Sequence, residues 1–265
     1  MSATQAEIPE GFTDAFLDWF RERTEATWAA YRPRTLEDYI AAGVGGRDWQ
    51  QGTRWTGGLT EQEIAAVERR WRVRFPPDYR LFLRRLHTPD SPMRGAHYTN
   101  EPGTASRLVP DEAPAFRNWL SDTDNIQHAL DWLAEGLEFD IEYADLWRPG
   151  WGPRPATLDA RKARLRQLVA HAPRMIPVFG HRYLLAEPCR ASNPVFSIYQ
   201  SDIIVYGPDL RTYLLVEFGD LLGLDQRETE WAAVQGQRGH EAFYASIPFW
   251  GDLYTHNNTL LEGNE

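Results

Sequence analysis

The chain has 265 residues, of which 42% are hydrophobic, so it can bury a sizeable core, and we expect one domain rather than two. Its formal net charge of −10 repels phosphate backbones, which argues against nucleic acid as a partner. No apolar stretch approaches the ~20 residues of a membrane helix, and residues 1–10 carry acids where a signal peptide carries basic residues, so we expect a cytoplasmic protein with no membrane contact.

The first predicted elements are helices. An apolar stripe that ends before Pro33 predicts an added N-terminal helix, and it consists of Phe12, Phe16, Trp19, Phe20 and Trp28. The run from Thr35 to Asp38 resembles a capping box, but the glycines from Gly43 to Gly46 end that helix within about two turns. A tryptophan-containing loop then leads to Gly58.

The clearest local signal is a pair of helices that follows this loop. Thr60 and Glu63 form a capping box, and Leu59 and Ile64 occupy the hydrophobic-staple positions on either side. After about twenty residues, Pro76-Pro77 begins a second amphipathic helix.

The middle of the chain is predicted to be mixed. Residues 87–114 are rich in Pro, Gly, Ser and Thr and predict a long surface loop. Residues 115–137 predict two short helices closed by Gly136, and the alternation of apolar and acidic residues over 137–143 predicts a strand. Residues 147–155 predict an irregular loop, and residues 158–172 predict a basic helix.

The C-terminal part changes to a two-residue period. Four close strands are predicted, at residues 176–179, 183–186, 195–200 and 203–206. A helix from Leu210 should follow and end at a left-handed Gly219, and the polar tail from Asp225 should return to the core at residues 247–250. Helices followed by a sheet predict an α+β fold with an antiparallel meander flanked by helices.

Several of these segments resemble a known family. The sequences LTEQEI (59–64) and FPPDYRLFL (75–83) are similar to the N-terminal signature of the Smi1/Knr4 family of the SUKH superfamily. The sequences PVFGHRY (177–183), NPVFSIYQ (193–200) and DIIVYG (202–207) resemble its bacterial branch. The resemblance covers roughly residues 55–220. It divides the chain into an N-terminal extension (1–57), a Smi1/Knr4-like domain (58–222) and a C-terminal tail (223–265), with both additions packed on the core.

The resemblance implies a non-catalytic module that binds proteins. Many bacterial members look like immunity proteins that neutralise toxins by direct binding, so the implied partner is a basic toxin domain docked on an acidic surface. The fungal relatives in cell-wall signalling leave open a regulatory scaffold. The sequence fixes neither the partner nor the oligomeric state.

The sequence contains none of the common catalytic or cofactor motifs. It has no Gly-x-Ser-x-Gly elbow, no phosphate-binding glycine loop, no His-Glu-x-x-His and no paired-cysteine zinc motif, so we expect no cofactor and no enzyme. The single cysteine, Cys189, cannot form an internal disulfide and is predicted to be a buried, inert thiol.

Acidic residues form the best candidate for a cation site. Asp140, Glu142 and Asp145 would lie partly on one face of the predicted strand and could bind a hard cation. We favour solvated charges at a strand edge, because acids are usually exposed. In that interpretation Asp140 and Glu142 are candidates for contacting a basic partner.

The strands offer one alternative acid–base group. His181 could exchange a proton near neutral pH, and an unrecognised enzyme could combine it with Glu187 and Asp202. We favour a structural role in which His181 anchors the turn between two strands through ring hydrogen bonds. Tyr199, Gln200 and Asp202 could project from one rim of the sheet, although core support and turn formation explain them equally well.

Two tryptophans in the irregular loop are the other binding candidates. Exposed aromatic residues often anchor interfaces, although large aromatic side chains more often fill a core. The partner-binding candidates are therefore Asp140, Glu142, Trp147, Trp151, His181, Arg182, Tyr199 and Asp202.

Overall fold

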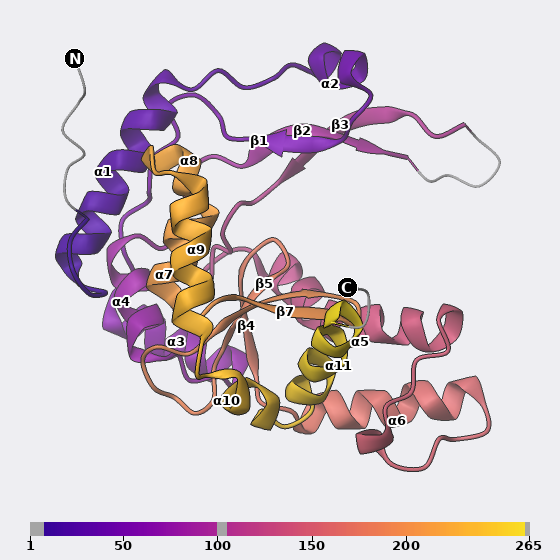
Figure 1. The fold of residues 1–265 in the computed structure, drawn as a ribbon. Coiled ribbons are helices and arrows are strands. Elements are labelled where there is room, and N and C mark those ends of the chain that lie inside the picture. The colour runs from indigo at the N-terminus through magenta and orange to yellow at the C-terminus, as the bar shows by residue number, and fades with distance from the viewer. Residues whose placement is uncertain (1–7, 100–104, 263–265) are drawn as a thin grey trace.

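The computed structural model describes residues 8–99 and 105–262, and within these residues the chain forms two antiparallel sheets surrounded by helices (Figure 1). The first sheet contains β1 (Gly46–Asp48), β2 (Met93–Tyr98) and β3 (Leu108–Ala113) in that order. The second is the meander β4 (Met175–Phe179), β5 (Arg182–Leu185), β6 (Val195–Tyr199) and β7 (Asp202–Gly207). The predicted α+β fold and the predicted four-stranded meander are confirmed.

The predicted N-terminal helices are present with their caps. Helix α1 (Asp14–Ala30) buries Phe16, Phe20 and Trp28, and α2 (Leu36–Ala42) starts with a capping box at Thr35. Helix α2 ends at Gly43, which adopts a left-handed φ of 63°. A left-handed C-cap costs glycine little, because it has no Cβ to clash.

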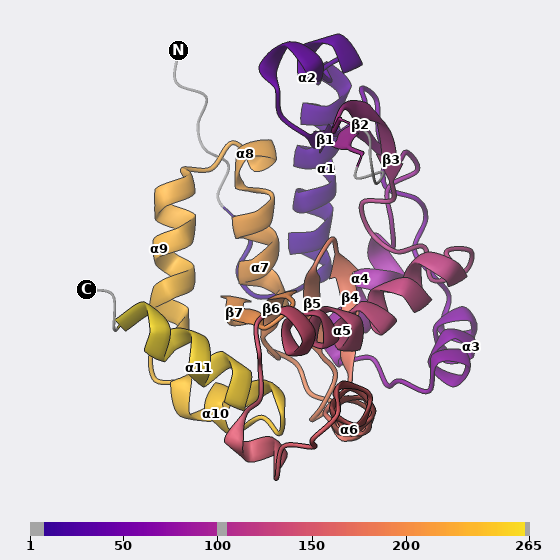
Figure 2. The ribbon, with the colours of Figure 1, turned by 90° about the vertical axis from the view of Figure 1, so that its right-hand side faces the viewer.

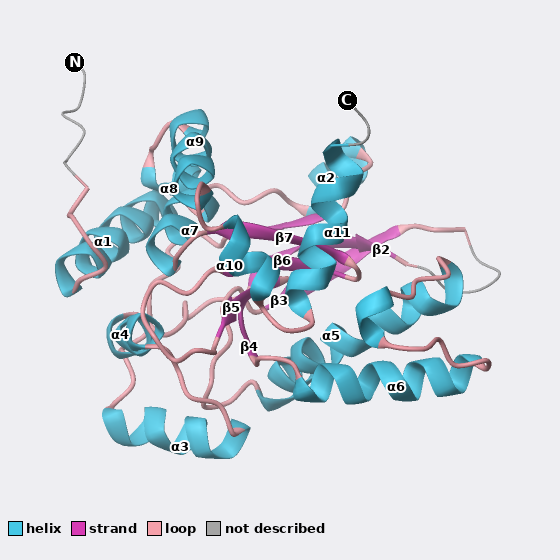
Figure 3. Cartoon of the chain, turned by 60° about the horizontal axis from the view of Figure 1, so that its bottom comes forward, coloured by secondary structure: helices cyan, strands magenta, loops and turns pink. Residues whose placement is uncertain are grey.

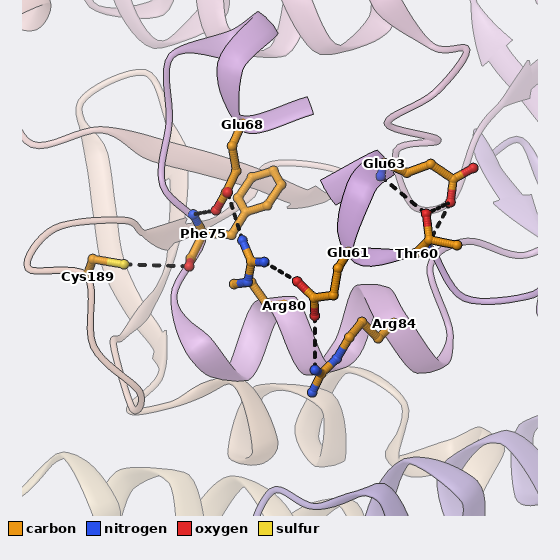
Figure 4. A network of polar contacts seen from close by, with 8 residues as sticks. All are labelled: Thr60, Glu61, Glu63, Glu68, Phe75, Arg80, Arg84 and Cys189. Atoms are coloured by element: carbon orange, nitrogen blue, oxygen red, sulfur yellow. Dashed lines mark hydrogen bonds and ion pairs between the residues drawn. The ribbon is translucent and has the colours of Figure 1, made fainter. Parts of the chain in front are cut away.

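Helix α3 (Glu61–Trp71) begins at the predicted capping box. The Thr60 hydroxyl accepts the Glu63 N–H at 3.2 Å, and the Glu63 carboxylate accepts the Thr60 N–H at 2.8 Å. Figure 4 shows this reciprocal pair. Two donors that would otherwise lack partners at the helix start are therefore satisfied by side chains.

Helix α4 (Pro77–Arg85) is tied to α3 by ion pairs (Figure 4). Arg80 binds both Glu61 and Glu68, and the Glu68 carboxylate also accepts the Phe75 N–H at 2.8 Å. The same network reaches Cys189, whose Sγ lies 3.5 Å from the Phe75 carbonyl oxygen. Cys189 is exposed, so the predicted buried thiol is wrong.

The predicted loop at residues 87–114 is also wrong, because β2 and β3 form a hairpin there. Gly95 explains why the segment looked like a loop. It lies opposite Arg47, and a Cβ on it would lie 1.9 Å from the Gly46 carbonyl oxygen. Glycine is therefore required for strand contact at this point, instead of marking a break.

The largest difference from the sequence prediction lies at residues 115–143. A single helix, α5 (Thr123–Tyr143), replaces the second predicted short helix and the predicted strand. Gly136 lies inside this helix, where a Cβ would lie 3.2 Å from the Gln200 Cα. The glycine allows the β6–β7 turn to approach the helix closely.

The remaining helices enclose the second sheet. The predicted basic helix is confirmed as α6 (Leu158–His171), which follows the 3-10 turn η1 (Pro149–Trp151) and lies beside α5 (Figure 3). Helix α7 (Leu210–Glu217) is followed by α8 (Gly219–Leu222), so the predicted left-handed cap at Gly219 is wrong. The left-handed residue is Gly223, with a φ of 69°.

The C-terminal segment, for which only a polar tail was predicted, is helical. It forms α9 (Gln226–Gln237), α10 (Glu241–Ser246) and α11 (Trp250–Glu262). Ile247 and Trp250 are buried, as predicted for the return of the tail to the core.

Both faces of the four-stranded sheet are covered. Figure 2 shows α1 and α7 above the sheet and α6, α10 and α11 below it. Phe16, Phe20, Val195 and Phe218 belong to the upper core, whereas Tyr183, Phe196, Ile203 and Trp250 belong to the lower core. Residues that alternate along β6 therefore enter different cores, which is the strand periodicity that the sequence predicted.

Candidate functional site

Four of the predicted site residues lie together where the two hairpin turns of the meander meet. Tyr199 pairs with Asp202 across β6 and β7, and the His181 and Tyr199 ring centroids are 6.1 Å apart. Arg182 pairs with Ser197 on the adjacent strands β5 and β6. We call His181, Arg182, Tyr199 and Asp202 the hairpin rim.

Within the hairpin rim, Arg182 is held in place by its neighbours. Its Nε donates to Glu217 at 3.1 Å and one terminal nitrogen donates to Ser197 Oγ at 2.9 Å. The guanidinium also lies 3.8 Å from the centre of the Tyr206 ring. Burial raises the pKa of Glu217, and the positive charge of Arg182 opposes this shift. Arg182 therefore links the sheet to α7.

His181 lies beside this arginine at the β4–β5 turn. Its ring Nε2 is hydrogen-bonded to the adjacent Arg182, and its carbonyl oxygen accepts the Ile198 N–H at 3.0 Å, so the contact with β6 comes from the backbone and not from the predicted ring hydrogen bonds. Partial burial of the ring lowers the pKa of His181, and the charge of Arg182 lowers it further. Both effects favour the neutral form of the ring.

The three residues of the alternative acid–base group do not converge. His181 directly precedes the first residue of β5, and Asp202 is the first residue of β7. Both therefore lie at the end of the sheet that carries the β4–β5 and β6–β7 turns. Glu187 follows β5 at the opposite end of that strand. This arrangement gives no common site for proton transfer among the three side chains.

Asp140 is inside α5 and not on a strand edge. Only 7% of its surface is exposed. Its carboxylate accepts the Ser201 N–H at 2.9 Å and the Ser201 hydroxyl at 2.6 Å. Asp140 therefore fixes the β6–β7 turn beneath the hairpin rim, and it is not available to a partner.

The other two acids of the predicted cluster have separate partners. Glu142 pairs with Lys162 of α6 at 2.5 Å, and Asp145 pairs with Arg154. These hydrogen-bonded cations lower the pKa of each carboxyl group. Within residues 8–99 and 105–262, no group of three or more His, Cys, Asp or Glu side chains is placed to hold a metal ion.

The two candidate tryptophans pack against each other around η1, because Trp147 precedes this turn and Trp151 is its last residue. Trp151 is 2% exposed and stacks on Phe249 with ring centroids 5.7 Å apart. Trp147 meets Trp151 edge-on at 5.5 Å and donates its indole N–H to the Gly152 carbonyl oxygen. Trp151 is a buried plug, as the sequence analysis favoured, and lies outside any contact surface.

The structure places three aromatic side chains of α5 that sequence reasoning missed in a row with the predicted Tyr199. Phe139 is 50% exposed and Tyr143 is 69% exposed, and their rings lie 4.6 Å apart on α5. Trp132, on the same helix, lies 5.9 Å from the ring of Tyr199, which is 55% exposed. We call Trp132, Phe139, Tyr143 and Tyr199 the aromatic ridge.

The aromatic ridge is bordered by acids. Helix α5 contains six carboxylates, at Asp124, Asp131, Glu135, Glu138, Asp140 and Glu142, and no Lys or Arg. Trp132, Phe139 and Tyr143 are seven and four residues apart, so they fall on one stripe of the helix. The exposed Asp131, Glu135 and Glu142 fall on the adjacent stripe. If residues 123–143 had been predicted to form a helix, the sequence would have indicated both the aromatic stripe and the acidic stripe.

Comparison with known proteins gives no further assignment. Protein-family models, curated proteins and solved structures were all compared with the chain, and none matched. Among the residues that the structure describes, no helix has both the length and the apolar character required to cross a bilayer. The case for function therefore comes from the aromatic ridge, its acidic border and the resemblance of the sequence motifs.

Proposed function

We propose that this protein is a non-catalytic binding module that docks a basic protein domain on the aromatic ridge. The observation that carries the proposal is the pair Phe139 and Tyr143, two large aromatic side chains that face solvent beside exposed acids. Aromatic residues of this kind supply most of the binding energy in many interfaces, and neighbouring charges guide the encounter.

The charge distribution supports a basic partner. Some carboxylates of α5 are already neutralised, since Glu138 pairs with Arg166 and Glu142 pairs with Lys162. Asp131 and Glu135 are exposed and make no ion pair with a described residue. Together with the net charge of −10, they provide a negative field that accelerates association with a cationic surface.

The motif resemblance gives the partner its proposed identity. Bacterial chains with Smi1/Knr4-like segments look like immunity proteins, so we propose a toxin domain as the partner and the cytoplasm as the place of action. The protein would neutralise the toxin by covering its active surface. No chemical step on either chain is needed for this inhibition.

The first experiment is affinity capture with the full chain as bait, followed by binding kinetics on the partner that is recovered. Bait proteins are the wild type, a Phe139→Ala/Tyr143→Ala variant and a Trp231→Ala control. Trp231 is a solvent-facing aromatic residue on α9, with 61% of its surface exposed, so the control removes an aromatic side chain outside the ridge. We expect a basic toxin domain to bind wild type and control equally, and to dissociate from the double variant at least ~10-fold faster.

Charge reversal tests the acidic border separately. Glu135→Lys should slow association several-fold at low salt, and this difference should fade as salt approaches ~0.15 M or more. Glu228→Lys on α9 changes the charge of the chain by the same amount at a distant exposed position. Equal capture by the double aromatic variant, or equal effects of the two charge reversals, would contradict binding at the ridge.

A further inference from the structure

A second feature of the molecule is a cavity on the other side of α5. It has a volume of about 430 Å³ and lies among α3, α5, α6 and the start of β4. This volume is in the range of small-molecule binding sites, which is about 300–1,000 Å³. The cavity is partly open to solvent.

The walls of the cavity are mainly apolar. Trp71 and Trp119 meet edge-on with ring centroids 6.3 Å apart, and both line the space. Aliphatic side chains complete the walls, and they include Leu130, Leu133, Val169, Met175 and Ile176. A flat or branched apolar group would therefore contact aromatic and aliphatic surfaces on several sides.

The charged residues of the cavity are all cationic. Its lining contains Arg70, Arg72 and Arg174 and no Asp or Glu, although the chain as a whole has 38 acids and 28 basic residues. None of the three arginines forms an ion pair with a carboxylate of the described residues. Arg80 and Arg182, by contrast, each form an ion pair with a carboxylate.

The three guanidinium groups come from two segments. Arg70 lies against the Trp71 ring at 5.7 Å and donates to the Thr123 hydroxyl at 2.8 Å, so it bridges α3 and the start of α5. Arg72 ends α3 in the left-handed conformation, with a φ of 51°, and Arg174 directly precedes β4. All three are exposed residues of the lining, which places their charges at the solvent side of the apolar space.

We propose that this cavity binds a small organic anion with an aromatic or branched apolar body. The body would fill the space between Trp71, Trp119 and Leu133, and the acidic group would meet the arginines at the opening. Arg donates planar, charge-assisted hydrogen bonds that match carboxylate and phosphate oxygens. An unpaired group of arginines beside an apolar cavity supplies both parts of this recognition.

The cavity is separate from the surface of the proposed function. Leu130 and Leu133 project from α5 into the cavity, whereas Trp132 lies between them in sequence and contacts Tyr199. In a helix, these positions are about 100–200° around the axis from Trp132. Loss of ligand binding and loss of partner binding can therefore be separated by mutation.

The test uses anilinonaphthalene sulfonate, a fluorescent apolar anion, with the full-length protein. Phenylnaphthylamine has the same rings without the sulfonate and serves as the neutral probe. We expect saturable binding of one sulfonate probe per chain, and an affinity at least ~10-fold lower in an Arg70→Gln/Arg174→Gln variant, with little change for the neutral probe. Arg164→Gln, at an exposed position of α6 outside the lining, should bind both probes like the wild type.

A blocking variant checks the location without removing charge. Ala170 is an exposed lining residue of α6, so Ala170→Trp should fill the opening and weaken both probes while the helix is kept. Competition with naphthoate and with naphthyl phosphate then distinguishes a carboxylate from a phosphate ligand. Sulfonate binding that is unchanged in the arginine double variant, or in Ala170→Trp, would overturn the proposal.

Discussion

Replacement of Asp140 by alanine should destabilise the protein by about 2–4 kcal/mol. The side chain is 7% exposed, and its carboxylate accepts two bonds from Ser201 at 2.9 and 2.6 Å. A hydrogen bond to a charged group contributes ~1.5–3 kcal/mol, and loss of both also leaves a gap between α5 and the β6–β7 turn. Part of the loss is recovered because the turn can admit water.

The measurement is equilibrium unfolding in urea, followed by circular dichroism. Asp140→Asn should recover about half of the loss, since its amide oxygen can take the place of Oδ2 and accept both bonds, but without the charge that strengthens them. Asp131→Ala is the matched control on the same helix, where the exposed carboxylate accepts only the Gln127 amide at 2.8 Å and should contribute less than ~0.5 kcal/mol. A loss for Asp140→Ala that is no larger than for Asp131→Ala would refute the assigned role.

Two further predictions concern α3 and a buried histidine. Thr60→Ala should lower the free energy of unfolding by about 1 kcal/mol in urea melts, because it removes the acceptor of the Glu63 N–H, and Thr60→Ser should restore it. Burial lowers the pKa of His87 from 6.5 to about 4, and its Nε2 accepts the Trp119 N–H at 3.2 Å. As pH falls, His87 therefore takes up its proton in the unfolded chain before it does so in the folded protein. The free energy of unfolding should fall by up to about 3 kcal/mol as pH decreases from 6.5 to 4. In urea melts, His87→Asn should show a weaker dependence of this free energy on pH.

The elements predicted well from sequence carry their own local information. Each capping box, at Thr35 and at Thr60, is a motif of four consecutive residues that determines where its helix begins. Both are formed as expected. The meander was predicted because its strands alternate between two cores and are joined by short turns. These features need no knowledge of distant parts of the chain.

The first sheet was missed because its determinants are not local. Gly95 and Pro110 are typical loop residues, and they belong to paired strands. Gly95 is needed because the backbone of Gly46, about fifty residues earlier, lies against it. The need for glycine at position 95 is therefore apparent only when its pairing with β1 is known.

The structure brings the residues of the hairpin rim together, as predicted, but it separates the three acids of the predicted cation site. His181, Arg182, Tyr199 and Asp202 adjoin the turns of one meander, so a correct strand prediction was enough to place them near one another. The burial of Asp140 depends on the approach of Ser201, and that approach depends on α5 being a helix. The error in one element therefore became an error in the binding surface.

The sequence 137–143 shows why α5 was mistaken for a strand and why that helix is a candidate interface. Its apolar and acidic residues alternate, which predicts a strand with one buried face. In the helix, Leu137 and Ile141 point into the core, whereas Phe139 and Tyr143 form a second apolar stripe in solvent. A helix whose only apolar requirement was the core would leave that second stripe polar. The alternation therefore reflects a helix with two apolar faces, and we propose that a partner protein covers the exposed face.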